Sequence, residues 1–280
     1  MRQQAEIGIS GRTAKRSRNV VKIDCLMGTC GRCRLARESL ACFLQQTALS
    51  NATLLIYNQH PVALHFDHAR VRIINEAPPA GSLRHVKRRM IELADPSAEF
   101  IHWWDDDDLY LPWHLRDCLD HIGQSVAWKP ASSWFLDENN AFTRERNTFE
   151  GSWMIRADYL KAAPLNTHPT YTDHPVFRQI GEAGKLATTE LAGRTSYIYR
   201  WGMGVQHVSG YGSGDEEKQR ANLERWRANS TDICPDGRLV PADLSPRWRQ
   251  FLDATRDQVT AEEWELNRHA LALALSQAPV

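Results

Sequence analysis

The sequence constrains its fold most strongly at residues 100–108, where an apolar run is followed at once by four aspartates. The run FIHWW has the length and character of a buried β-strand. Four adjacent carboxylates repel one another and cannot enter an apolar core without compensation. The strand is therefore expected to end where the core ends, with the aspartates beside a cation, a ligand or solvent.

Strands and helices alternate before the aspartates. Apolar runs predict strands at 20–27, 52–58 and 70–75, and the spacing of apolar residues predicts helices at 34–47 and 82–94. This order indicates an α/β fold with a mostly parallel central sheet flanked by helices. Ligands of such sheets bind beyond the carboxyl ends of the strands, which is where the aspartates are expected.

Composition limits the possible functions and the environment. Lys plus Arg and Asp plus Glu both number 34, so no net charge draws the chain to nucleic acid or acidic membranes. Residues 1–19 lack the apolar segment of a secretory signal, and no apolar run reaches about 18 residues, so we expect a cytoplasmic protein. Cys30 and Cys33 have Cys-x-x-Cys spacing, but no second pair completes a zinc site, and we expect reduced thiols.

Two explanations fit the acidic run itself. A divalent cation with oxygen ligands would relieve the repulsion among the carboxylates. Alternatively, acidic residues complement the positive end of a helix, and the segment after Pro112 is expected to be helical. Capping requires one or two acids and this run has four, which favours the cation.

The order of these segments resembles that of the family 2 glycosyltransferases. WDDDDLYLP is similar to the family's strand end, Asp-x-Asp-Asp, hydrophobic pair and Pro, and GTCGRCRLARESLACFLQQT at 28–47 resembles its opening strand end and helix. Residues 82–103 resemble the family's next helix and strand. The resemblance covers residues 20–200 and implies a GT-A fold, which is Rossmann-like, in an enzyme that transfers a sugar from a nucleotide-sugar donor to an acceptor hydroxyl.

The resemblance divides the chain into three parts. We expect a basic, flexible leader at 1–19 and the GT-A domain at 20–214, with a nucleotide-sugar-binding half at 20–110 and an acceptor half at 111–214. Residues 215–280 carry charged amphipathic segments and are expected to form a helical C-terminal extension.

The acidic motif is expected to bind both donor and metal. By resemblance, Asp105 lies near the donor ribose and Asp107 binds the Mn²⁺ or Mg²⁺ that bridges the donor diphosphate, with Asp105 as the other acid of the metal pair. Asp106 and Asp108 are neighbours that raise the local field, and Asp106 is counted among the residues that bind the nucleotide sugar. His207, in a glycine-rich loop after the predicted strand at 197–201, is either a further metal ligand or a structural or acceptor-contacting histidine.

Other donor-binding residues follow from the first two strand ends and the basic helix. Thr29, Cys30 and Arg32 stand where the family has Thr-Tyr and Arg, and the aromatic ring beside the nucleobase is missing. Asn58 replaces an aspartate that would accept from the uracil N3–H, and its carbonyl oxygen can accept the same bond, so a UDP-sugar is favoured. Lys87 stands in place of a family Arg and contacts either the donor or solvent.

The acceptor half contains one expected catalytic residue. Asp173, in YTDHPVFRQI, matches the family's catalytic acid position. Inverting transfer needs one carboxylate to deprotonate the acceptor hydroxyl, and we assign Asp173 as this general base. The same position suits a helix N-cap before Pro175, and one side chain can fill both roles.

Other functions remain open from the sequence. A nucleotidyltransferase would share the sheet and acidic site, although MGTCGR at 27–32 is a poor match to its glycine-rich loop. A non-catalytic nucleic-acid-binding module would use the leader and RHVKRR at 84–89, against which the zero net charge argues. The acceptor is a saccharide or a modified base in DNA, and both stack on aromatic rings such as Trp103, Trp113, Trp128, Trp134 and Trp153.

Overall fold

The computed structural model describes residues 21–30, 32–47, 51–76, 83–137, 139–163, 174–191, 194–201, 234 and 236–276. The expected leader at 1–19, the glycine-rich loop at 202–214 and the first part of the expected extension, 215–233, lie outside these described residues. In the described part of the chain, every helix is too short or too polar to cross a membrane.

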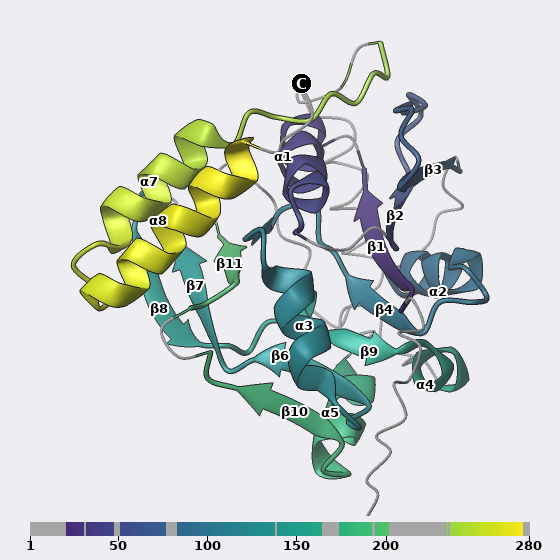
Figure 1. The fold of residues 1–280 in the computed structure, drawn as a ribbon. Coiled ribbons are helices and arrows are strands. Elements are labelled where there is room, and N and C mark those ends of the chain that lie inside the picture. Colours follow the sequence, from purple (N-terminus) through teal and green to yellow (C-terminus); the bar gives the residue numbers. More distant parts are fainter. Residues whose placement is uncertain are drawn as a thin grey trace, which may run out of the picture.

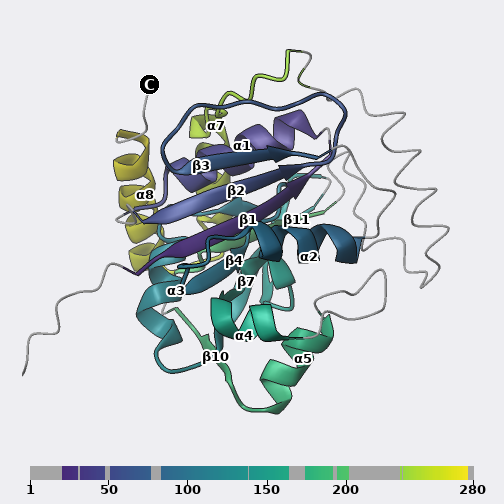
Figure 2. The same ribbon diagram turned by 90° about the vertical axis from the view of Figure 1, so that its right-hand side faces the viewer.

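A seven-stranded sheet forms the centre of the molecule, in the order β10-β6-β9-β4-β1-β2-β3 (Figures 1 and 2). β9 is antiparallel to both its neighbours, and the other paired strands are parallel. The expectation of a mostly parallel central sheet is confirmed. The strands are β1 (Ile23–Thr29), β2 (Ala52–Asn58), β3 (Val71–Asn75), β4 (Phe100–Trp103), β6 (Ala127–Pro130), β9 (Met154–Arg156) and β10 (Leu186–Thr189).

Helices cover both faces of this sheet, because successive side chains of a strand point to opposite faces. In β1, Cys25 and Met27 pack in the core that includes α1 and α3, whereas Leu26 packs in the core that includes α2, α4 and α5. The helices that flank the sheet are α1 (Cys33–Leu44), α2 (Leu83–Leu93), α3 (His114–Ile122), α4 (Ala157–Ala162) and α5 (His174–Glu182).

A second, four-stranded sheet lies beside the first, in the order β5-β11-β7-β8. Two helices near the C-terminus, drawn in yellow-green and yellow in Figure 1, pack against it. Phe251 of the first of these helices contacts two strands, with its ring centroid 5.7 Å from Trp134 and 5.5 Å from Phe142. The elements are β5 (Leu109–Tyr110), β7 (Ser132–Leu136), β8 (Phe142–Arg146), β11 (Tyr197–Arg200), α7 (Ser245–Thr255) and α8 (Ala261–Ser276).

Two tryptophans hold these C-terminal helices in place. Trp248 of α7 is buried and donates from Nε1 to Oε1 of Gln45, just after α1, at 3.0 Å. Trp264 of α8 donates to the carbonyl oxygen of Leu252 in α7 at 3.0 Å. The helices therefore pack on the rest of the chain through large rings whose polar N–H is satisfied.

Candidate active site

The carboxyl ends of three neighbouring strands bring the predicted site together. Thr29 at the end of β1 pairs with Asn58 at the end of β2, and Leu26 of β1 pairs with Trp103 at the end of β4. The acidic run begins two residues after Trp103. Residues far apart in the sequence therefore meet at one edge because parallel strands end on the same side.

The four aspartates divide into two pairs by burial. Asp106 and Asp108 are each 1% exposed, whereas Asp105 and Asp107 are only half-buried. Burial raises the pKa of the Asp106 carboxyl to about 7, although the charge of Arg32 acts to lower it. Burial and repulsion from Asp107 raise the pKa of Asp108 well above its ordinary value. The members of the expected Asp-x-Asp pair are thus the two more accessible carboxylates.

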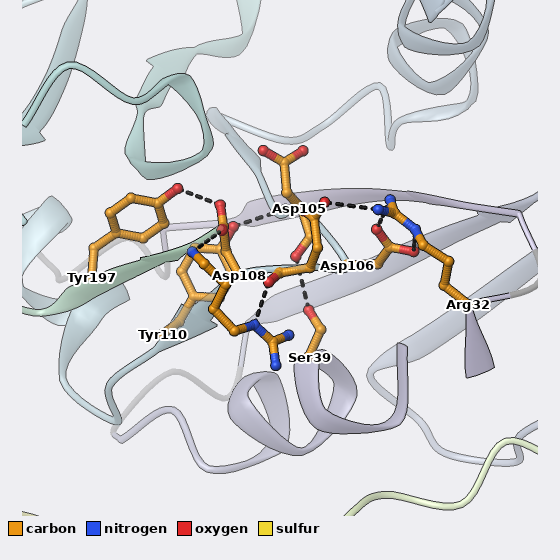
Figure 3. A network of polar contacts seen from close by, with 9 residues as sticks. Arg32, Ser39, Asp105, Asp106, Asp108, Tyr110 and Tyr197 are labelled. Carbon is orange, nitrogen blue, oxygen red and sulfur yellow. Dashed lines mark hydrogen bonds and ion pairs between the residues drawn. The ribbon is translucent and has the colours of Figure 1, made fainter. Parts of the chain in front are cut away.

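Arg32, which immediately precedes α1, forms ion pairs with two of these acids (Figure 3). Its Nε donates to Oδ2 of Asp106 at 3.1 Å, its Nη2 also bonds Asp106, and its Nη1 donates to Oδ2 of Asp107 at 2.7 Å. The aspartates raise the pKa of Arg32 despite its burial. One guanidinium therefore supplies part of the positive charge that the acidic run requires.

Asp108 joins the acidic run to the second sheet. Its carboxylate accepts a hydrogen bond from the Tyr197 hydroxyl (Figure 3). It accepts another, at 3.1 Å, from the backbone N–H of Arg200. The Arg200 guanidinium donates from Nε to the carbonyl oxygen of Asp107 and pairs with Glu38 of α1. Asp108 thus holds the loop in position, and the sequence pattern did not reveal Tyr197, Arg200 or Glu38 as parts of this network.

Asp105 is held by neighbours that the sequence analysis also missed. Its N–H donates to the Tyr110 hydroxyl at 2.8 Å, and its carbonyl oxygen accepts from the Ser39 hydroxyl at 3.1 Å. Tyr110 in turn donates to the carbonyl oxygen of Gly151 at 3.1 Å. A Cβ atom at Gly151 would lie 2.5 Å from Oδ2 of Asp105, so only glycine allows this close approach.

A pocket lies beside the acidic run. Its polar walls are Thr29, Arg32 and Asn58, and His60 lies beside them; its apolar walls are Cys33, Ala36, Val62, Leu64 and Cys234. The Asn58 side chain donates to Oδ1 of Asn75 at 2.9 Å and accepts from the N–H of His60 at 3.0 Å. The side-chain oxygen of Asn58 has a second lone pair that can accept another hydrogen bond.

Two other predicted donor residues lie near these strand ends. Cys30 is buried immediately after β1. Lys87 of α2 is also buried, and its Nζ lies 4.8 Å from the ring centroid of Trp103. A cation over an aromatic face is stabilised by the ring quadrupole. Lys87 is therefore not on a solvated helix face, which was one of its two predicted environments.

The expectation of six reduced cysteines is wrong for one pair. Cys33 and Cys234 form a disulfide, with their Cα atoms 5.5 Å apart, and Cys25, Cys30, Cys42 and Cys118 are buried free thiols. The fold joins positions separated by 201 residues, which Cys-x-x-Cys spacing does not reveal. The bond cross-links the start of α1 to the segment before α7 and forms part of the pocket wall.

A buried cluster of His102, His114 and Cys118 underlies the acidic run, with all possible ligand atoms within 4.8 Å of one another. The two Nε2 atoms lie 2.8 Å apart, and Nδ1 of His114 lies 2.9 Å from the Ser196 hydroxyl. Two imidazole nitrogens on one tetrahedral zinc would lie about 3.3 Å apart, given Zn–N bonds of about 2.0–2.1 Å. The closer contact is a hydrogen bond between neutral rings, and the cluster is structural.

These histidines give a prediction for the pH dependence of stability. Burial lowers the pKa of His102 from 6.5 to about 3, so below pH 6.5 the unfolded chain takes up a proton that the folded chain refuses. His102→Gln removes this proton uptake and keeps a side chain able to reach His114. Wild type is expected to lose about 1.4 kcal/mol of unfolding free energy per pH unit relative to the variant below pH 6.

The measurement is urea unfolding of both proteins between pH 7.5 and pH 5. Groups away from His102 titrate alike in both proteins, and burial keeps the pKa of His114 low in each, so the difference between the two plots of unfolding free energy against pH reports mainly His102. If the unfolding free energies of wild type and variant change with pH in parallel, His102 already binds its proton in the folded state.

The tryptophans proposed as stacking surfaces form the core instead. All five are at most 5% exposed, because each lies on or beside a strand or helix that faces another layer. They are Trp103, Trp113, Trp128, Trp134 and Trp153. The expected general base Asp173 and the candidate ligand His207 lie outside the described residues, and α5 begins at the residue after Asp173.

No family model matches the sequence, and no curated protein matches it. Two solved structures of S. aureus TarS, residues 1–349, are similar in fold. The complex with UDP has a TM-score of 0.51 and 11% identity, and the similarity covers 91% of this chain and 88% of that one. The complex with UDP-GlcNAc has a TM-score of 0.51 and 11% identity, and the similarity covers 92% of this chain and 82% of that one. The fold of this chain is therefore the GT-A fold.

Proposed function

We propose that the protein is a glycosyltransferase that moves a sugar from a nucleotide-sugar donor to an acceptor hydroxyl. The observation that supports this most directly is the half-buried pair Asp105 and Asp107 beside a pocket at the carboxyl edge of a GT-A sheet. TarS, which is similar in fold, is bound to UDP in one structure and to UDP-GlcNAc in another. A UDP-sugar is accordingly the donor that we favour.

The pocket is the proposed nucleoside site. Thr29 and Asn58 form its polar walls, and the remaining lone pair of Asn58 is the acceptor for a nucleobase N–H. Cys30 lies just beyond Thr29 at the end of β1. Lys87, buried against Trp103, supplies a positive charge for the diphosphate at the end of the neighbouring strand β4.

Asp105 and Asp107 are the residues that would hold Mn²⁺ or Mg²⁺. Their carboxylate oxygens are the ligands that hard cations prefer, and both are more accessible than Asp106 and Asp108. A bound divalent cation neutralises the charge that grows on a nucleoside diphosphate leaving group. Arg32 already pairs with Asp107, so cation binding requires Arg32 to share this carboxylate. We include His207 as a candidate third ligand.

The chain's own residues preorganise the site. Arg32 offsets the charge of Asp106 and Asp107, and the bonds from Tyr197 and the Arg200 N–H fix Asp108. Fixed charges and dipoles of this kind stabilise developing charge without reorganisation during the reaction. Asp173 is the proposed general base, and a base that deprotonates the acceptor on the face opposite the diphosphate gives inversion.

Donor turnover tests the proposal. Purified protein is incubated with UDP-, GDP-, TDP- and CDP-sugars, with Mn²⁺ or with a chelator, and nucleoside diphosphate release is measured. We expect release from one donor, a UDP-sugar, that stops on chelation. If no donor reacts and no nucleotide shifts the melting temperature in the presence of metal, the acidic run is structural and the proposed function is wrong.

A further inference from the structure

Strand β11 carries a row of aromatic residues that leads outward from the acidic run. Tyr197, Tyr199 and Trp201 alternate along the chain, so their side chains lie on one face of the strand. The N–H of Trp201 donates to the carbonyl oxygen of Leu136 at 2.9 Å, which continues the pairing with β7 beyond the end of β11. Tyr197 is fully buried, Tyr199 is half-buried and Trp201 is 40% exposed.

Two phenylalanines pack against this row, and together the rings form an aromatic platform. Phe149 stacks on Tyr199 with ring centroids 3.8 Å apart and planes inclined by 4°. Phe135, the β7 partner of Tyr199, lies 5.9 Å from it, and Trp201 lies 6.4 Å from Tyr199 at 27°. Phe135, Phe149 and Tyr199 are only half-buried. Part of the apolar surface of these rings is exposed to water. A ligand that covered this surface would gain the free energy of removing it from water.

Two points beside the platform connect it to the proposed reaction centre. At the inner end of the row, the Tyr197 hydroxyl donates to Asp108 (Figure 3). On the other side, Phe149 immediately precedes a short 3-10 helix, Glu150–Ser152, in which Gly151 touches Asp105. A molecule on the platform therefore has one end directed at the acidic run, as the acceptor of a transfer reaction requires.

The charges beside the platform favour a neutral ligand. Glu150 is next to Phe149, and Glu145 lies on the same face of β8 as the residue paired with Phe135. Arg146 follows Glu145 directly in β8, so its side chain points to the opposite face. The described charges on the side of the platform are therefore acidic, which disfavours an anionic ligand. A nucleic-acid backbone needs cations along its path, whereas sugar rings place their apolar face on an aromatic ring and their hydroxyls on mixed polar groups.

We propose that Phe135, Phe149, Tyr199 and Trp201 form an acceptor site for a neutral saccharide, with a sugar ring stacked on Trp201 and a hydroxyl directed toward the acidic run. This inference rests on the proposed transferase function. It assigns the acceptor class, which the donor site does not determine, and it places stacking on the four half-buried or exposed rings instead of the buried tryptophans.

Calorimetric binding tests the platform without turnover. The probes are tetrasaccharides of β-linked glucose, of mannose and of N-acetylglucosamine, titrated into the full chain with UDP and Mn²⁺. We expect at least one to bind, and Trp201→Ala to weaken it about tenfold while Trp201→Phe retains most of the affinity. Tyr159→Ala, a half-buried ring on α4, is the control and is expected to bind as wild type does.

The outcomes separate this inference from the proposed function. If no tetrasaccharide binds, if Trp201→Ala binds as wild type does, or if only single-stranded DNA binds in a Trp201-dependent manner, the saccharide site is wrong, whatever the donor assay shows. Binding that depends on Trp201 supports the site even when no donor turns over, and in that case only the transferase proposal fails. UDP affinity is expected to be equal in all variants, which excludes a general loss of fold.

Discussion

Asp107→Asn is expected to lower sugar transfer by about 10²–10³-fold, the loss typical when one preorganised electrostatic group is removed from an active site. The amide keeps the size of the side chain but lacks the charge that would hold a divalent cation. The fold is expected to survive, because Asp107 is half-buried and Arg32 keeps its two bonds to Asp106. Initial rates of nucleoside diphosphate release across a range of Mn²⁺ concentrations measure the effect.

Two further variants sharpen the interpretation. Asp106→Asn is expected to cost less than Asp107→Asn, because Asp106 is buried against Arg32 and is not one of the two proposed metal ligands. Asp257→Asn, on the exposed surface, is the control and is expected to match wild type. An Asp107→Asn enzyme with the wild-type rate and the wild-type response to Mn²⁺ would remove Asp107 from the metal site.

Loss of the Cys33–Cys234 disulfide is expected to lower the free energy of unfolding by about 4–5 kcal/mol, because a cross-link restricts the unfolded chain. The bond closes a separation of 201 residues, and such long loops lie at the upper end of the entropic effect. The measurement is urea unfolding of the oxidised wild type and of Cys33→Ser/Cys234→Ser. A fluorescent thiol label should react with four thiols in the unfolded, unreduced wild type, the free cysteines 25, 30, 42 and 118.

A reducing agent provides the internal control. Reductant is expected to bring the wild type to the stability of the double variant and to leave the double variant unchanged. Six reactive thiols in the unreduced wild type, or equal unfolding curves for both proteins, would show that the bond does not form in solution.

The sequence predicted the first half of the central sheet well. The expected strand at 52–58 coincides with β2, and the expected helices at 34–47 and 82–94 contain α2 and nearly all of α1. Such segments are predictable because burial on one face of a helix, or within a parallel strand, imposes its own spacing of apolar residues. β5, β7 and β8 were missed. β5 is only two residues long, and all three belong to the four-stranded sheet in which β5 pairs with the distant strand β11.

The acidic run was also predicted only in part. Its position at a strand end was predicted from the apolar run and charge repulsion, and it is confirmed. The pairing of Asp105 with Asp107 as metal ligands rests on the resemblance to family 2 glycosyltransferases and stays a prediction. Which carboxylates are buried did not follow, because their partners Arg32 and Tyr197 lie 74 and 89 residues from them in the chain. Gly151 and Ser39 contact Asp105 from other elements and carry no local signal.

The sequence by itself therefore determined the α/β class and the edge of the sheet where the acidic run lies. The spacing of apolar residues and the placement of charges are local properties of the sequence, and they do not depend on which distant segments pack together. Tertiary structure alone decided the Cys33–Cys234 bond, the burial of the five tryptophans, the split of four like charges into two structural and two accessible acids, and the aromatic platform along β11. Each of these depends on which distant surfaces pack together, and packing is fixed only when the whole core forms.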